Sequence, residues 1–245
     1  FLGSIVFGNM MPVILGARTI SDQVTFDESI PMQIVVVDLD TLTEVKRFET
    51  DPGAMIHFGN AFEEGDELII DGMFQDNFGA NETLQDVFNP DGRFGGGWYM
   101  RYFLNMKTGE LKSEQVMETE CEFPTFNTAF TGSRNEVTYT ACSVDNGANS
   151  FFNGISRVTR DGDATVVVLP AGCYGSEPVF VPKINATKED DGYLMEVVYN
   201  GFEHKSELQI YRADDVNDHV CSLKLKHHVP HQFHGFYTPE VFATT

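Results

Sequence analysis

The chain has 245 residues, 42% of them hydrophobic, which is enough to bury a substantial core in one large domain or two smaller ones. It carries 37 acidic against 16 basic residues, for a formal charge of -21. Because such a surface repels a phosphate backbone, the composition argues against nucleic acid as a partner. The four cysteines, Cys121, Cys142, Cys173 and Cys221, form no CxxC pair, which is typical of free thiols in a reducing compartment.

The opening segment from Phe1 to Ala17 (FLGSIVFGNMMPVILGA) is apolar, but Asn9 and Pro12 interrupt it and no basic region precedes it. A helix that spans a membrane needs about 20 apolar residues, so the segment is too short for a span. It also lacks the charged flank of a signal peptide. Since the chain starts with Phe rather than Met, we expect a processed protein or a piece of a longer one.

Four segments share a pattern in which an alternating apolar run leads through a polar turn into a second alternating run. Each predicts a β-hairpin, because alternation places apolar side chains on one face of a strand. They are QIVVVDLDTLTEVKRF from Gln33, RYFLNMKTGELKSEQV from Arg101, ISRVTRDGDATVVVL from Ile155 and ELQIYRADDVNDHVCSLKL from Glu207. Glycines at positions 109 and 162 supply the backbone freedom that tight reversals need.

Further strand candidates lie between the hairpins, at Glu67–Asp71, Glu136–Thr140, Pro178–Pro182 and Tyr193–Tyr199. The predicted fold class is therefore all-β. Two to four strands that recur roughly every 50 to 70 residues are typical of propeller blades, although a pair of β-sandwiches would share part of the pattern. At this spacing the whole chain, residues 1–245, supplies only four or five blades, so we expect one partial β-propeller domain.

The seven histidines include a dense group in HHVPHQFH, where His228, His231 and His234 have the spacing of a zinc site. Pro230 argues against a helix through this segment, and in an extended chain His231 would face away from the other two. A zinc site formed by this segment alone is therefore disfavoured. For the remaining histidines of the second half, His204, His219 and His227, a structural role is the simpler interpretation.

His57 and His234 differ from the others in their surroundings. His57 lies between apolar neighbours directly before an acidic turn, and His234 lies between an aromatic residue and Gly235, where we expect that bulk would crowd a ligand. Glu122 and Glu177 are each followed by apolar residues or proline rather than by charges. A carboxylate is costly to bury without a partner, and a metal-binding imidazole commonly donates its second N–H to such a group.

The order of four blocks resembles the second half of the carotenoid cleavage oxygenases, a family that includes apocarotenoid- and stilbene-cleaving dioxygenases and the retinoid isomerases of vision. The blocks are IHFGNAFEEGDELIIDG, EFPTFN, YGSEPVFVP followed by EDDGY, and HHVPHQFHG. They span Ile56 to Gly235, or about three quarters of the chain. Each block alone is a weak signal, whereas the ordered set is specific.

The resemblance implies a seven-bladed propeller with a non-haem iron(II), Fe(2+), on its axis, held by four histidines. His57 matches the third ligand and His234 the fourth, and Glu122 and Glu177 match the glutamates that hydrogen-bond those two histidines. Imidazole suits iron, and an outer carboxylate fixes its tautomer and orientation. The first two histidine motifs have no counterpart here, so we expect them upstream of Phe1 and expect the chain alone to be inactive.

The implied activity is that of an oxidoreductase, a dioxygenase that uses O2 to cleave a conjugated C=C bond of a carotenoid or apocarotenoid to carbonyl products. Two alternatives stay open: a stilbene-cleaving or retinoid-isomerising member of the family, and a metal-free propeller that serves as an interaction module. The resemblance further implies an apolar polyene or stilbene substrate and a cytoplasmic or peripheral membrane location. The segment from Phe1 to Ala17 is the local candidate for membrane contact, with a buried strand as the other interpretation.

Overall fold

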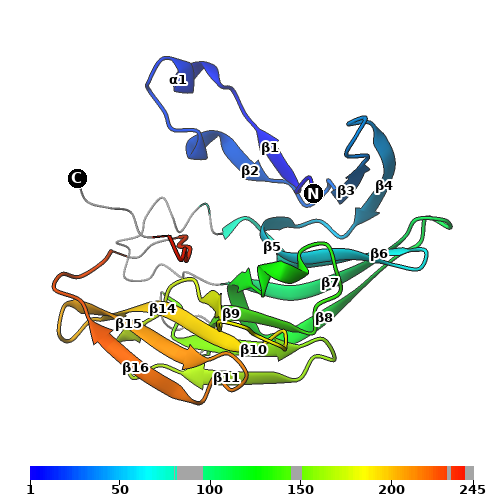
Figure 1. Cartoon of the computed structure of the whole chain (residues 1–245). Coiled ribbons are helices and arrows are strands. Elements are labelled where there is room, and N and C mark those ends of the chain that lie inside the picture. The colour runs from blue at the N-terminus through cyan, green and yellow to red at the C-terminus, as the bar shows by residue number, and fades with distance from the viewer. Residues whose placement is uncertain (80, 82–95, 145–150, 231–232, 241–245) are drawn as a thin grey trace.

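The structure is a computed structural model, and it describes residues 1–79, 81, 96–144, 151–230 and 233–240. The described residues form antiparallel strands almost throughout (Figure 1), which confirms the all-β prediction. The helices are short: α1 (Met11–Ile14) and the 3-10 helices η1 (Ser21–Gln23) and η2 (Thr128–Phe130).

The strands follow the chain order as a series of antiparallel neighbours. They are β1 (Ile5–Phe7), β2 (Val24–Phe26), β3 (Met32–Val37), β4 (Glu44–Thr50), β5 (Ala54–Glu64), β6 (Glu67–Gln75), β7 (Gly97–Asn105), β8 (Leu111–Thr125), β9 (Val137–Ser143), β10 (Gly154–Thr159), β11 (Ala164–Val168), β12 (Cys173–Tyr174), β13 (Val179–Pro182), β14 (Gly192–Asn200), β15 (Lys205–Arg212) and β16 (His219–Lys224).

All four predicted hairpins are present, as β3–β4, β7–β8, β10–β11 and β15–β16. Gly109 in the β7–β8 turn has a φ of 84° and Gly162 in the β10–β11 turn a φ of 88°. These angles lie in the left-handed region, which glycine enters without the steric penalty of a Cβ. The further predicted strands are also found, within β6, β9, β13 and β14.

One strand, β8, belongs to two successive meanders. Its first part, up to Cys121, pairs with β7, and its last part, from Glu120, pairs with β9. The strands β5–β6–β7–β8 and β8–β9–β10–β11 are each a four-stranded meander, and the shared strand joins them into one seven-stranded sheet. A separate five-stranded sheet follows, in which β14 pairs with both β12 and β13 and β16 is the last strand.

Apolar clusters fill the spaces between these sheets. One joins β9 and β10 to the five-stranded sheet, with Tyr139, Ile155, Leu194 and Tyr211 among its members. Strand β9 lies between two such clusters, and all seven of its residues are buried. Cys121, Cys142 and Cys173 are buried free thiols and Cys221 is partly exposed, which agrees with the prediction of free cysteines.

The core also contains a buried ion pair between β6 and β7. The Arg101 guanidinium lies 2.7 Å from Asp71, and the Tyr99 hydroxyl donates to the same carboxylate at 2.9 Å. Both charged side chains are at most 5% exposed. The carboxylate is therefore fully engaged, and removing one partner would leave an uncompensated buried charge.

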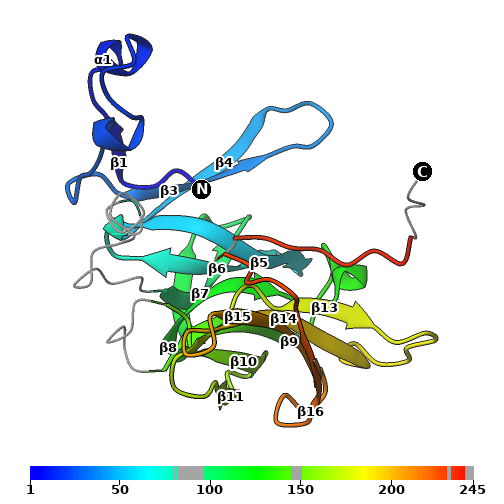
Figure 2. The same ribbon diagram turned by 90° about the vertical axis from the view of Figure 1, so that its left-hand side faces the viewer.

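The opening segment is not the buried strand that was one of its two interpretations. The hairpin β1–β2 and α1 project away from the sheets (Figures 1 and 2). More than half of each of five apolar side chains there is exposed: Leu2, Phe7, Met11, Ile14 and Leu15. Within the described residues, no helix has the length and apolar character that crossing a membrane requires.

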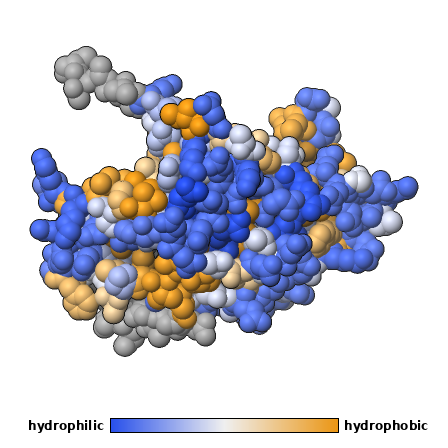
Figure 3. Space-filling model, turned by 60° about the horizontal axis from the view of Figure 1, so that its bottom comes forward, coloured by the Kyte–Doolittle hydropathy of each residue, from blue (hydrophilic) through white to orange (hydrophobic). Residues whose placement is uncertain are grey.

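The molecular surface is mainly hydrophilic on the face in Figure 3, with separate hydrophobic patches. With 37 acidic and 16 basic residues, most of the charge on such a surface is negative. A negative surface of this kind favours solubility and disfavours polyanionic partners.

Candidate metal centre

His57 lies where strand β5 loses its register with β6. The ladder pairs Met55 with Phe74 and then Phe58 with Gly72, so one extra residue of β5 is accommodated between these pairs. A bulge of this kind turns a side chain out of the regular alternation. The His57 ring nitrogen Nδ1 lies 2.6 Å from Oε2 of Glu122, and the two side chains are 20% and 7% exposed.

His234 lies in the C-terminal segment, which returns past β5 (Figure 2). Its Nδ1 is 3.2 Å from Oε1 of Glu177, and the second oxygen of that carboxylate accepts the Gly235 N–H at 2.8 Å. Glu177 sits in the connection between β12 and β13 and is 17% exposed, whereas His234 is 58% exposed. The Glu177 carboxylate therefore contacts both the exposed imidazole of His234 and the backbone N–H of the next residue, Gly235.

The two histidine–glutamate pairs meet at the ring nitrogens that face away from the carboxylates. Nε2 of His57 is 3.2 Å from Nε2 of His234. A carboxylate accepts the Nδ1 proton, so each neutral imidazole presents a lone pair at Nε2. Two lone pairs at this distance repel unless a proton or a cation lies between them. Imidazole nitrogens that bind one ion at about 2.1 Å and at right angles are about 3 Å apart.

The donor set suits a first-row transition metal, because neutral imidazoles backed by carboxylates are typical ligands of such ions. Within the described part of the chain, no group of three or more His, Cys, Asp or Glu side chains is placed to hold a metal ion. The geometry among these residues thus brings two nitrogen donors together.

The charge balance of the site depends on His57. Burial opposes the charge on its imidazolium, but the hydrogen bond and charge of Glu122, with a smaller contribution from Glu177, outweigh that effect and raise the pKa of His57 above its ordinary value. The same two carboxylates that would attract a proton to this position would attract a metal cation to it.

Phe123, which the sequence interpretation did not single out, is part of the same arrangement. Its ring centroid is 5.0 Å from that of His57 and 5.8 Å from that of His234. Its backbone N–H donates to Oε2 of Glu122 at 2.8 Å, and its φ is 54°, at the point where β8 and β9 lose register. A bulky residue in this left-handed region, directly before Pro124, is strained. The sequence signal was the Phe-Pro pair after Glu122.

The glycine after His234 contributes its backbone N–H to the contact with Glu177. A Cβ added at Gly235 would meet only one described protein atom, Val179 Cγ2 at 3.9 Å, which is ordinary contact. The expectation that bulk there would crowd a ligand concerns the bound state and stays a prediction. Of the other histidines in the segment, His228 packs against Tyr199, with ring centroids 6.4 Å apart, and His231 lies outside the described residues.

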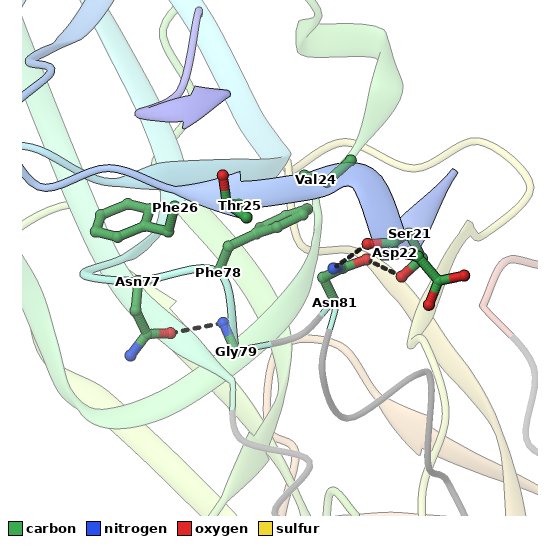
Figure 4. Close-up of a pocket in the computed structure, with 9 residues that line it drawn as sticks. All are labelled: Ser21, Asp22, Val24, Thr25, Phe26, Asn77, Phe78, Gly79 and Asn81. Carbon is green, nitrogen blue, oxygen red and sulfur yellow. Dashed lines mark hydrogen bonds between the residues drawn. The ribbon is translucent and has the colours of Figure 1, made fainter. Parts of the chain in front are cut away.

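A separate pocket of about 690 Å³ lies between β2 and the end of β6 (Figure 4). None of the four side chains of the two histidine–glutamate pairs lines it. Its polar groups bond to one another: Ser21 Oγ is 2.5 Å from Asn81 Oδ1, and the Gly79 N–H donates to Asn77 Oδ1 at 2.7 Å. Among the described residues that line it, no buried side-chain nitrogen or oxygen lacks a hydrogen-bond partner, so these residues do not point to a ligand.

Comparisons with known proteins identify the family of the chain. The family model described as RPE65, retinal pigment epithelial membrane protein, matches residues 5–239. The chain is 29% identical over 238 residues to the apocarotenoid-15,15'-oxygenase of Synechocystis sp. and 29% identical over 211 residues to a carotenoid 9,10(9',10')-cleavage dioxygenase of Crocus sativus. These alignments cover 96% and 80% of this chain, but 48% and 38% of the relatives.

Solved structures show the same relationship. A crystal structure of an ACO/RPE65 chimera superposes with a TM-score of 0.85 at 27% identity, over 96% of this chain and 50% of the other. Cobalt-substituted ACO of Synechocystis superposes with a TM-score of 0.81 at 27% identity, over 94% of this chain and 48% of the other. The chain thus spans about half the length of the proteins it matches.

Proposed function

This chain belongs to the RPE65 and carotenoid cleavage oxygenase family, and from that premise we propose that it supplies half of an iron(II) site in a dioxygenase that cleaves a conjugated C=C bond. The observation that carries the proposal is the 3.2 Å approach of the two Nε2 atoms of His57 and His234, each backed by a glutamate. The substrate class is a carotenoid or apocarotenoid, in line with the named relatives.

The four side chains divide the work of holding the metal. His57 and His234 would bind it through Nε2, while Glu122 and Glu177 accept the Nδ1 protons and keep both rings in the tautomer that leaves Nε2 free. Two further histidines would complete the site, as the family resemblance implies; among the described residues these two nitrogen donors converge.

The chemistry that iron(II) supplies when bound is activation of O2 toward an electron-rich alkene. In the overall reaction one C=C bond breaks and each carbon takes one oxygen atom of O2, so the products are two carbonyl compounds and no other reductant is needed. This chain's residues would hold the metal and line its approach with aromatic surface, since Phe123 lies against both imidazoles.

We also propose that the two four-stranded meanders, the five-stranded sheet and the preceding hairpins are four to five blades of a seven-bladed propeller. The meander connectivity of β5–β8 and β8–β11 and the antiparallel sheet of β12–β16 support this proposal, as does the superposition on half of each ACO-type structure. In such a ring the Nε2 atoms of His57 and His234, which lie 3.2 Å apart, would face the central axis.

The test is product analysis with labelled oxygen. The protein that carries this chain is loaded with iron(II) without air, then given an apocarotenal and ¹⁸O2. We expect aldehyde products that contain ¹⁸O, and no turnover for His57→Ala or His234→Ala. A geometric isomer of the substrate without label would instead indicate isomerase activity, and absence of iron together with unchanged behaviour of both variants would contradict the metal site altogether.

A further inference from the structure

Glu196 lies in the middle of an apolar face of strand β14. Leu194, Glu196 and Val198 point to the same side of the strand, and all three are at most 1% exposed. Leu194 and Val198 belong to two different apolar clusters, so the glutamate lies between them in the core. A carboxyl group at such a position costs stability unless something requires it there.

Within the described residues, neither oxygen of the Glu196 carboxyl group has a hydrogen-bond partner. The opposite residue on β15, Gln209, uses its carbonyl oxygen to accept the Tyr211 hydroxyl. The titratable groups that face Glu196 are acids: Cys142 from β9, and Tyr211 with Glu207 from β15. The surroundings thus favour an uncharged Glu196.

The carboxyl group instead occupies the space beneath Gly175. A Cβ added at Gly175 would lie 2.0 Å from Oε1 of Glu196 and 2.8 Å from its Cδ. A side chain at residue 175 would therefore displace the carboxyl group of Glu196 from its present position. The two residues come from different segments that face each other, so the carboxyl group defines how closely the backbone at Gly175 can approach β14.

Gly175 begins the short segment that carries Glu177. This segment bridges β12 and β13, which pair with opposite ends of β14. It is fastened by the Gly175 N–H, which donates to the Phe152 carbonyl at 2.9 Å, and by Ser176 Oγ, which accepts the Val197 N–H at 3.3 Å. The position of Glu177, and hence of its contact with His234, follows from the position of this segment.

We propose that Glu196 is a positioning residue, whose uncharged carboxyl group supports Gly175 from below and so holds Glu177 where its carboxylate reaches His234. The importance of that contact for catalysis rests on the proposed function, but the contact itself does not require metal. Ionisation of Glu196 would place a buried negative charge under Gly175, which is two residues before Glu177. This charge would push the segment that carries Glu177 away from β14.

The support of Gly175 by Glu196 should depend on pH in the alkaline range. Burial raises the pKa of Glu196 to about 8, so the group is neutral near pH 7 and charged well above pH 8. The Glu177–His234 contact should therefore be intact at neutral pH and weaken as pH rises through this value. Glu196→Gln keeps the shape of the uncharged acid and cannot ionise, so it should keep the contact throughout.

The experiment follows the imidazole of His234 by NMR in the metal-free protein that carries this chain, labelled with ¹⁵N-histidine, from pH 6.5 to 9.5. The His234 signals are assigned by their loss in His234→Gln, and Glu177→Gln gives the chemical shift of the ring without its partner. For the wild-type chain we expect the shift to move at least halfway toward the Glu177→Gln value above pH 8. For Glu196→Gln we expect at most a small fraction of this change.

A second uncharged variant, Glu196→Met, keeps the test decisive if the glutamine variant does not fold. Asp218→Asn is the matched control, since it removes an exposed carboxylate from the turn between β15 and β16 of the same sheet. We expect its His234 response to equal that of the wild-type chain. Identical pH responses of the wild-type chain and the uncharged Glu196 variants would overturn the proposal. Because no metal is present, failure of iron binding would count against the proposed function alone.

Discussion

His57 and His234 lie 177 positions apart in the sequence, yet their Nε2 atoms are 3.2 Å apart, and each ring is held from behind by a different glutamate. One pair is largely buried and the other partly exposed. The predictions for this site depend on that difference and on the two carboxylates.

Removing either imidazole should abolish specific metal binding by this half-site. Cobalt(II) is a suitable probe, since its absorption spectrum reports nitrogen ligands and a cobalt-substituted relative has been crystallised. We expect the spectrum of the cobalt-loaded chain to be lost in His57→Gln and in His234→Gln. His228→Gln, which changes a histidine that packs against Tyr199, should leave it unchanged. An unaltered spectrum in both site variants would show that the metal binds elsewhere.

Replacing either glutamate by glutamine should weaken cobalt binding about 10- to 100-fold, the usual effect of an outer carboxylate. We expect the larger loss for Glu122→Gln, because Glu122 is 7% exposed and Glu177 17% exposed, and buried charges are less screened by water. Competition titration with a chelator of known affinity measures both values. Equal affinities for wild type and variants would mean that the carboxylates do not support the ligands.

The left-handed backbone of Phe123 should reverse the usual order of alanine and glycine. Both substitutions remove the ring, but only alanine keeps the steric penalty of a positive φ, so Phe123→Gly should be more stable than Phe123→Ala by about 1 kcal/mol. Urea denaturation measures the difference. Phe152, buried beside Phe123 and without a positive φ, is the control: there the glycine variant should be the less stable one. The same order at both positions would disprove backbone strain.

The stability of the chain should depend on pH through Glu196. Its folded pKa, about 8, lies above its ordinary value of 4.5, so between these values the folded state holds a proton that the unfolded state has lost. The free energy of unfolding of the wild type, relative to Glu196→Gln, should therefore fall as pH rises, by at most about 1.4 kcal/mol per pH unit. Denaturation midpoints at pH 5, 7 and 9 test this. A difference that is constant or grows with pH would contradict it.

The buried pair of Asp71 and Arg101 should be sensitive to loss of one partner. We expect Asp71→Asn to lower the free energy of unfolding by about 3 kcal/mol, because the buried Arg101 would keep only its longer, 3.6 Å contact to the largely exposed Glu114. Glu136→Gln is the control, since it removes one partner of the exposed Arg134–Glu136 pair and should change stability by less than about 1 kcal/mol. Similar losses for the two variants would mean that the charge of Arg101 does not depend on Asp71 for its compensation.

The hairpins could be predicted because alternation and turn glycines are local signals. QIVVVDLDTLTEVKRF and ISRVTRDGDATVVVL became β3–β4 and β10–β11 with the expected turns. The four site side chains were named from the order of the sequence blocks, and the structure brings them together as two pairs.

What could not be predicted depends on register and on distant contacts. The extra residue beside His57, the strained backbone of Phe123 and the approach of Glu196 to Gly175 all arise where two segments far apart in the chain must fit. The apolar opening segment likewise gives no local sign of whether it is covered, and the structure leaves it exposed.

The sharing of β8 between two meanders has a consequence for unfolding. Residues Glu120 and Cys121 lie in the stretch where the ladder with β7 overlaps the ladder with β9, so neither meander can lose this strand without breaking the other. Separate blades could open one at a time, whereas β5–β11 should open as a single cooperative unit. His57 lies on β5 and Glu122 on β8, so both members of this pair belong to that one unit.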